Sequence, residues 1–150
     1  MKIILLKIAS ALLTTLLLCL TLFGYQAQAK TIRVAIVMDD MGYRDTDKNA
    51  LNLPGEITYA FLPHTTYGKK LAEQANKDNH DVLIHIPMES ENRKKLGPGA
   101  LTSSMDEQAF NQSLSNSLAE IPFAIGINNH MGSSLTQLYM PMTWTMTFLK

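Results

Sequence analysis

The chain has 150 residues, of which 46% are hydrophobic and 17% charged, and its 13 basic residues balance its 13 acidic residues. This balance argues against a nucleic-acid-binding protein, which needs an excess of basic residues on one face. Aromatic residues make up 7% of the chain and there is a single cysteine, so neither a platform for stacking bases nor a disulfide framework is available.

The first 29 residues have the three parts of a secretory signal peptide. Lys2 and Lys7 precede an apolar run over residues 8–23, and the segment closes on an A-x-A motif that ends at Ala29. A membrane anchor is the alternative, but the run is shorter than the ~20 apolar residues that a transmembrane helix needs. We therefore expect cleavage at this motif and a periplasmic or secreted domain over residues 30–150, with membrane contact only through an uncleaved leader. Cleavage would remove the single cysteine, so the chemistry must come from carboxylates, histidines and hydroxyls.

The rest of the chain alternates apolar runs with helical patterns. In chain order these predict a strand over 33–38, a short helix over 45–53, a strand over 57–62, a helix over 67–79, a strand over 81–86, a helix over 104–121, a strand over 124–128 and a helix in the tail over 135–149. The alternation predicts an α/β fold with parallel strands joined by crossovers.

The predicted helix over 104–121 has the clearest local signals. Ser104 and Glu107 have the S-x-x-E spacing of a capping box. An apolar stripe at helical spacing follows, made of Phe110, Leu114, Leu118 and Ile121. In the tail, Trp144, Met146 and Phe148 alternate as in a strand. We favour a helix from the spacing of Leu135, Leu138, Met142, Met146 and Leu149.

Polar side chains follow or end each predicted strand. They are Asp39 and Asp40 after the first, His64 after the second, His85 and Glu89 at the third, and Asn128, Asn129 and His130 at the fourth. The carboxyl ends of parallel strands meet at one edge of a sheet, where active sites are built, so we expect these residues to converge. His80 precedes the third strand and should lie at the opposite edge.

Two neutral imidazoles and a carboxylate can hold a metal ion and leave positions open for water and substrate. Asp40, His85 and His130 are our candidates for such a site, and hydrogen-bonded structural histidines are the alternative. A glycosidase would have to combine Asp39 with Glu89, because neighbouring residues on a strand point in opposite directions. The chain has neither a G-x-S-x-G elbow nor a Walker or G-x-G-x-x-G loop, so we expect no nucleotide ligand.

Five segments in order resemble the divergent polysaccharide deacetylase family, which is related to the NodB-type carbohydrate deacetylases. They are VAIVMDDMGY (34–43), AFLPHT (60–65), HIPME (85–89), GPGAL (97–101) and NNHMGS (128–133). The resemblance implies an exported bacterial protein with a distorted (β/α) barrel. Such a barrel needs about 250 residues, so we expect the chain to be a truncated, N-terminal part of it with four strand–helix units.

The resemblance also implies roles for the residues at the strand ends. Asp39 would be the catalytic base and Asp40 a metal ligand, with His85 and His130 as further ligands. Three residues would contact substrate: His64, Glu89 and Asn129. The NodB relatives place two ligand histidines close together on one segment, a spacing that His80 and His85 do not match.

The expected activity is metal-dependent hydrolysis of acetyl groups on an acetylated polysaccharide or peptidoglycan-like glycan, with zinc as the expected ion. The alternative is a catalytically inactive envelope protein that keeps the fold to bind a glycan or a protein partner.

Overall fold

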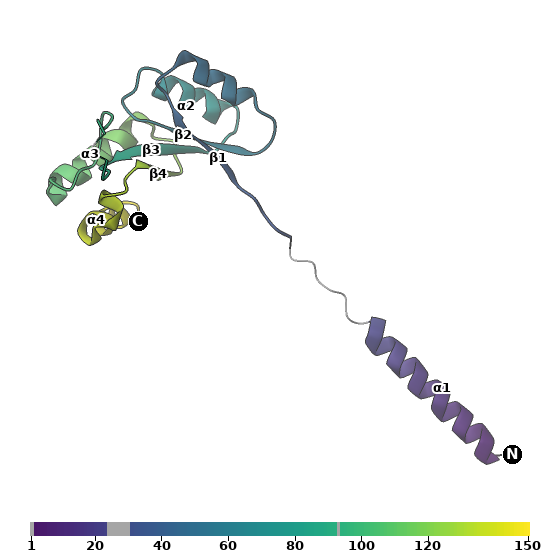
Figure 1. The fold of residues 1–150 in the computed structure, drawn as a ribbon. Coiled ribbons are helices and arrows are strands. Elements are labelled where there is room, and N and C mark those ends of the chain that lie inside the picture. The colour runs from purple at the N-terminus through teal and green to yellow at the C-terminus, as the bar shows by residue number, and fades with distance from the viewer. Residues whose placement is uncertain (1, 24–30, 93) are drawn as a thin grey trace. The chain divides into compact units, whose positions relative to one another are not determined.

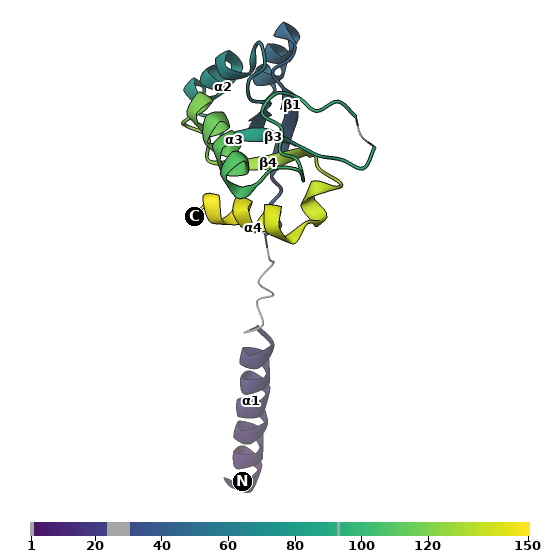
Figure 2. The same cartoon turned by 90° about the vertical axis from the view of Figure 1, so that its left-hand side faces the viewer.

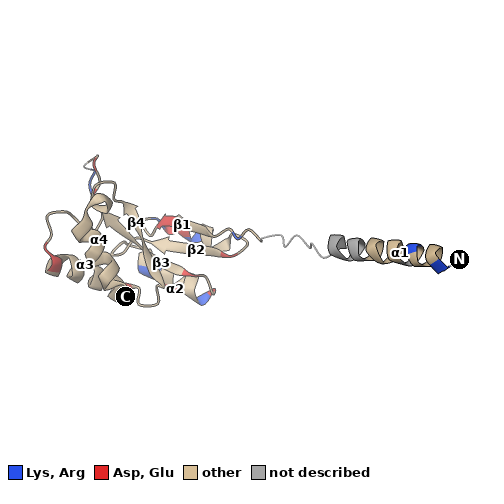
Figure 3. Cartoon of the chain, turned by 90° about the horizontal axis from the view of Figure 1, so that it is seen from below, with Lys and Arg blue, Asp and Glu red and all other residues tan. Residues whose placement is uncertain are grey.

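The computed structural model describes residues 2–23, 31–92 and 94–150, and the chain divides into two compact units, Met1–Val34 and Ala35–Lys150 (Figure 1). The first unit contains helix α1 (Lys2–Phe23), with Lys2 and Lys7 near its start (Figure 3). Among the described residues, no helix has both the length and the apolar character that a membrane crossing requires. The predicted A-x-A cleavage motif lies outside the described residues.

The second unit is built on a four-stranded parallel sheet in the order β1-β2-β3-β4. The strands are β1 (Ile36–Met41), β2 (Ile57–Phe61), β3 (Val82–Met88) and β4 (Gly126–Met131). The connections contain the 3₁₀ helix η1 (Asp45–Asn52), α2 (Gly68–Lys77) and α3 (Glu107–Glu120), and the chain continues through η2 (Leu135–Gln137) into α4 (Tyr139–Phe148). The prediction of an α/β fold with the architecture of half a (β/α) barrel is confirmed.

The core lies between the sheet and its helices. Tyr59 and Phe61 on β2 and Ile84 and Ile86 on β3 alternate along their strands and are almost completely buried. Alternate residues of a strand share a face, so these side chains form the face on which the helices pack. In Figure 2, α2 and α3 lie on the same side of the sheet. The other face is left to the intervening residues, which include His85.

Two strands extend further into polar sequence than predicted. The first strand was expected over 33–38 and the last over 124–128, but β1 includes Asp39 and Asp40 and β4 includes Asn129 and His130. Ladder hydrogen bonds do not depend on side-chain polarity, so a strand continues wherever its neighbour offers backbone partners. The polar residues therefore belong to the strands and do not follow them.

The capping prediction for α3 is wrong by two residues. The N-cap is Asp106, whose carboxylate accepts the backbone N–H of Ala109 at 2.8 Å, and Glu107 is the first helical residue. Ser104 instead exchanges a hydroxyl hydrogen bond with Thr102. An Asp caps as well as a Ser, so the local sequence offered two competing starts.

The predicted apolar faces of α3 and α4 are correct only in part. Phe110 and Leu114 in α3 and Ile121 directly after it are buried, but Leu118 is exposed and Ser117 is buried in its place. In α4, the packed residues include Trp144, whose ring lies edge-on to Phe110 with centroids 5.5 Å apart. Met146 is 62% exposed, because the helix turns a different face to α3 than the spacing suggested.

Candidate metal centre

His85 lies in the middle of β3 on the face of the sheet away from the packed helices. Its side chain is 3% exposed. Within β3 it alternates with Ile84 and Ile86, which face the core. Both ring nitrogens have polar partners, which a buried imidazole requires.

Asp40 is turned toward His85 by a bulge in β1. Met38 pairs with Tyr59 and Met41 with Phe61, so Asp39 and Asp40 together oppose a single residue of β2. Asp40 has φ of 59°, a left-handed conformation that Asp tolerates better than most residues. Backbone strain of this kind is typical of functional sites.

The turn after the bulge depends on Gly42. It has φ of 127°, and a Cβ there would collide with Thr65 Oγ1 and approach the Cα of Gly68 to 2.9 Å. The carboxylate of Asp47 accepts the backbone N–H of Gly42 at 2.9 Å and that of Arg44 at 3.2 Å. These contacts hold the backbone directly after the bulge.

Asp40, His85 and His130 come from three strands and meet at one point. Asp40 Oδ1 lies 3.0 Å from His85 Nε2 and 2.6 Å from His130 Nδ1, and the two histidine nitrogens are 3.1 Å apart. Neighbouring strands are about 4.8 Å apart, so β1 and β4 would be separated by about 14 Å in a flat sheet. An Asp and a His side chain cannot bridge that distance, so the cluster depends on the curl of the sheet.

Ala60 lies on β2 between Asp40 of β1 and His85 of β3. It opposes the bulge of β1, pairs with Leu83 of β3 and is completely buried. Leu83 and His85 share a face because they are two residues apart, so Ala60 lies on that face as well. Its small side chain leaves the space through which Asp40 reaches His85.

The donor set fits a divalent metal ion. Each of the three residues offers one ligand atom, and these atoms lie within 4.8 Å of one another. Tetrahedral zinc with bonds of about 2.0–2.1 Å requires ligand atoms about 3.3 Å apart. The observed distances are a few tenths of an ångström shorter, with the largest difference between Asp40 and His130. Small rotations of exposed Asp40 would open the site, and His85 would stay in place.

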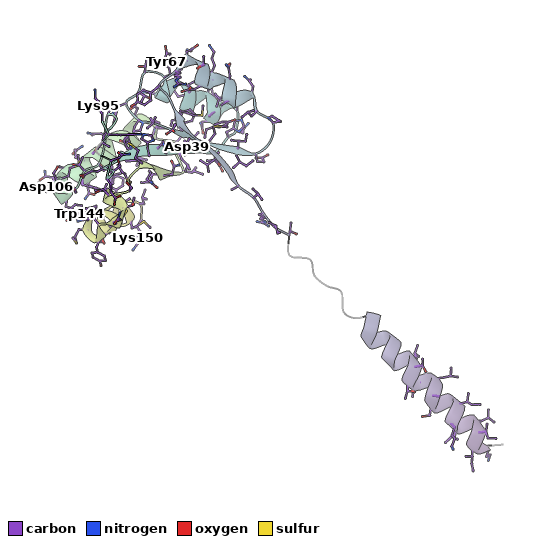
Figure 4. The ribbon with its side chains drawn as sticks, in the orientation of Figure 1. Asp39, Tyr67, Lys95, Asp106, Trp144 and Lys150 are labelled. Carbon is purple, nitrogen blue, oxygen red and sulfur yellow. The ribbon has the colours of Figure 1, made fainter. Side chains whose placement is uncertain are left out.

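A pocket of about 510 Å³ lies beside the cluster. It is lined by Asp39, Asp40 and His130 and by neighbouring residues that include Tyr43 and Arg44. Asp39 is exposed on β1 (Figure 4), and acidic residues mark this part of β1 in Figure 3. The bulge breaks the strict alternation of the strand, so both carboxylates line the same pocket, contrary to the expectation that they diverge.

His64 does not join the cluster. Its Nδ1 lies 2.5 Å from Glu120 Oε2, and its backbone N–H donates to the same oxygen at 2.8 Å. Its Nε2 lies 3.5 Å from the hydroxyl of buried Ser117. The left-handed φ of 57° at His64 directs the ring toward α3, so the expected convergence of three histidines is wrong. Its contact with substrate stays a prediction.

Glu89 and Asn129 also lie outside the three-residue group. Glu89 accepts the backbone N–H of Ser103 at 2.6 Å, and hydrogen bonds from the Ser103 side chain and backbone hold the pKa of its carboxyl below the ordinary value of 4.5. The Asn129 side chain donates to the Met131 carbonyl at 2.7 Å. Their contact with substrate stays a prediction. His80 lies at the other end of β3 with its ring edge-on to Tyr59.

Asn128 is among the strand-end residues expected to converge, but no role at the site was predicted for it. It pairs with His85 across the β3–β4 ladder, and its Oδ1 lies 2.9 Å from His85 Nδ1. The signal was present in the alternation of the strand, because Asn128 and His130 are two residues apart and share a face. Asn129 pairs with buried Ile86 and belongs to the opposite face.

A family profile and two uncharacterized bacterial proteins match this chain. The family profile described as divergent polysaccharide deacetylase matches residues 36–150. The uncharacterized protein YibQ of Escherichia coli is 36% identical over 105 residues, covering 69% of this chain and 33% of YibQ. An uncharacterized protein of Haemophilus influenzae is 34% identical over 119 residues, covering 79% of this chain and 42% of that protein.

A solved structure has the same fold. The crystal structure of the uncharacterized protein ATU2773 from Agrobacterium tumefaciens aligns with a TM-score of 0.73 and 24% identity, over 82% of this chain and 52% of that one. The chain therefore spans between a third and about a half of the length of these relatives.

Proposed function

Because the chain belongs to the divergent polysaccharide deacetylase family, we propose that it takes part in the metal-dependent removal of acetyl groups from an exported glycan. The observation that carries the proposal is the meeting of Asp40, His85 and His130 beside a pocket that Asp39 also lines. Carbohydrate deacetylation is the activity that the family supports. The metal, the glycan and the export of the protein are our proposals.

Zinc is the ion we propose for the site. Two imidazoles and one carboxylate are ligands that zinc accepts, and a catalytic zinc site keeps a position open beyond three protein ligands. When bound, the ion would supply a Lewis acid that polarises the acetyl carbonyl and acidifies a water molecule. Asp40 is 65% exposed on the pocket side, whereas His85 is buried, so substrate would approach past Asp40.

Asp39 is the proposed general base. It is an exposed carboxylate that lines the pocket next to the ligand Asp40. A general base must lie within hydrogen-bond reach of the attacking water. A water between Asp39 and the metal cluster would satisfy this requirement, and the carboxylate would take its proton as the water attacks the acetyl carbon.

Tyr43 and Arg44 are the proposed contacts to the sugar. Tyr43 is 51% exposed and lines the pocket, and a Cβ at Gly97 would come within 2.8 Å of its hydroxyl oxygen. The glycine thus lets the ring lie against the loop after β3. An exposed aromatic face and a guanidinium suit the apolar face and the hydroxyl groups of a pyranose ring.

A glycosidase is disfavoured by the state of Glu89. The general acid of a glycosidase needs a raised pKa, because it must hold a proton at neutral pH. Hydrogen bonds from Ser103 lower the pKa of Glu89 instead. Glu89 is therefore poorly suited to serve as that acid.

We further propose that residues 1–29 direct export. The support is the sequence pattern of Lys2, Lys7 and the apolar residues of α1, with no acidic residue in the segment. An envelope glycan would then be the natural substrate class. N-terminal sequencing of the protein recovered from the periplasm would test this, and a mature start other than Lys30 would contradict the proposed cleavage.

The activity is tested by measuring acetate released from acetylated glycan by the zinc-loaded chain. We expect Asp40→Ala to lose both zinc and acetate release, and Asp39→Asn to keep zinc but lose at least a hundredfold in rate, the contribution of a positioned base. New reducing ends without acetate would indicate a glycosidase. Binding of glycan and zinc with no acetate release would favour the inactive envelope protein.

A further inference from the structure

His85 and Asn128 form a hydrogen-bonded pair across the β3–β4 ladder. They are direct partners in the parallel register, and His85 Nδ1 and Asn128 Oδ1 are 2.9 Å apart. Asn128 is half-buried, whereas the ring of His85 is almost completely removed from solvent. The carboxamide is therefore the group that decides the hydrogen bonding of Nδ1.

The pairing assigns a proton to one ring nitrogen. An amide oxygen only accepts hydrogen bonds, so His85 Nδ1 must carry the proton. In a neutral imidazole the other nitrogen then has a free lone pair. That nitrogen, Nε2, lies 3.0 Å from Asp40 Oδ1 and 3.1 Å from His130 Nδ1, inside the proposed metal site.

We propose that Asn128 is a positioning residue that holds His85 in the Nδ1-protonated tautomer and so presents Nε2 to the cation. The inference rests on the proposed metal site and names no new ligand. A histidine ligand needs a partner on its other nitrogen to fix both tautomer and ring orientation. The strand ladder supplies that partner here, because the register places Asn128 opposite His85 and not one residue away.

A carboxamide differs from the carboxylate often found in this position. A carboxylate partner makes the imidazole a stronger ligand because it stabilises positive charge on the ring, whereas Asn128 is neutral. Replacing Asn128 by Asp keeps an acceptor at the same place and adds that charge. Replacing it by Leu keeps similar volume and removes the acceptor.

The first measurement needs no variant. In the zinc-loaded full chain labelled with ¹⁵N-histidine, we expect the His85 signals to show a protonated Nδ1 and an Nε2 that carries no proton. An Nδ1 without a proton would mean that Asn128 turns its NH₂ group toward the ring, and it would overturn the proposal.

The second measurement is the zinc dissociation constant of the full chain, obtained by competition with a chelator. We expect Asn128→Leu to weaken zinc binding 10–100-fold and Asn128→Asp to bind at least as tightly as the wild type. The matched control is Asn76→Leu on an exposed face of α2, which should leave the dissociation constant unchanged. Rescue by Asp would show that an acceptor at this position is sufficient, and thermal unfolding of the metal-free Asn128→Leu variant reports any packing defect.

Two outcomes are distinguishable failures. Wild-type zinc affinity in Asn128→Leu, together with loss of binding in Asp40→Ala, would overturn the positioning role and leave the metal site standing. Unchanged binding in Asp40→Ala would overturn the metal site and the positioning role with it. Thermal unfolding of each variant checks that it is folded. If Asn128→Leu is unfolded, the tautomer measurement on the wild type tests the positioning role.

Discussion

Zinc should stabilise the second unit of this protein through Asp40 and His130. A ligand that binds the folded chain alone raises the free energy of unfolding by about 2.7 kcal/mol at a concentration of 100 times its dissociation constant. Asp40 is mostly exposed and His130 is 27% exposed, so replacing either by Ala leaves no large cavity. Loss of the zinc effect in these variants would therefore report on the ligands and not on the fold.

The size of the shift follows from the size of the unit. Ala35–Lys150 contains 116 residues, and unfolding entropy is about 2.1 cal/mol/K per residue, or about 0.24 kcal/mol/K in total. Dividing about 2.7 kcal/mol by this entropy predicts a rise in Tm of about 11 °C. Asp40→Ala and His130→Ala should show a much smaller rise at the same zinc concentration.

The assay is thermal unfolding followed by circular dichroism, with and without zinc and with excess chelator as a blank. Glu56→Ala removes an exposed carboxylate just before β2, at the opposite edge of the sheet, and should respond to zinc as the wild type does. A full shift in Asp40→Ala and His130→Ala would refute these residues as zinc ligands. The absence of a shift in the wild type at saturating zinc would refute the zinc site itself.

Three further predictions concern the surroundings of the site and the helix that packs behind it. Ala60→Leu should fill the space over β2 through which Asp40 reaches His85. We expect it to lower the free energy of unfolding by about 1–3 kcal/mol in a urea titration and to abolish the zinc-dependent rise in Tm. A full zinc response would contradict the role of a small side chain at this position. Asp106→Ala should cost about 1 kcal/mol of stability through loss of the α3 cap, whereas Ser104→Ala should cost much less, and equal losses would restore the predicted capping box. Because hydrogen bonds from Ser103 lower the pKa of Glu89 below 4.5, the ionised carboxylate stabilises the fold above that pH, and the contribution disappears as pH falls through the lowered pKa. Glu89→Gln should therefore be less stable than the wild type above pH 4.5 and equal to it in strong acid, and a difference that does not change with pH would contradict this.

Much of the architecture could be predicted because its signals are local. β2 and β3 appeared as apolar runs bounded by turn residues, and the structure has them within one or two residues of the predicted limits. Asp40, His85 and His130 were chosen because parallel strands share an edge for their carboxyl ends, and the structure does bring these three together. Their roles as ligands and the role of Asp39 as a base stay predictions.

The predictions failed where two residues could both cap a helix and where a backbone angle sets the direction of a side chain. His64 was expected at the site, but a left-handed φ and the carboxylate of Glu120 direct its ring toward α3. The start of α3 had two suitable caps, Ser104 and Asp106, and the structure uses Asp106. Local sequence patterns do not show where the His64 ring points, because that depends on a contact with Glu120, which is far away in the chain.

The sequence by itself determined where the strands and most of the helices lie along the chain, the parallel arrangement of the strands and the kinds of side chain that reach the carboxyl edge of the sheet. These properties follow from the polarity and spacing of neighbouring residues. Tertiary structure decided which of those side chains touch. The curl of the sheet brings β1 to β4, the bulge at Asp39 and Asp40 turns both carboxylates into one pocket, and the β3–β4 register sets Asn128 against His85. Each of these depends on hydrogen bonds between distant strands, and a difference of one residue in register would place the same side chains on the opposite face.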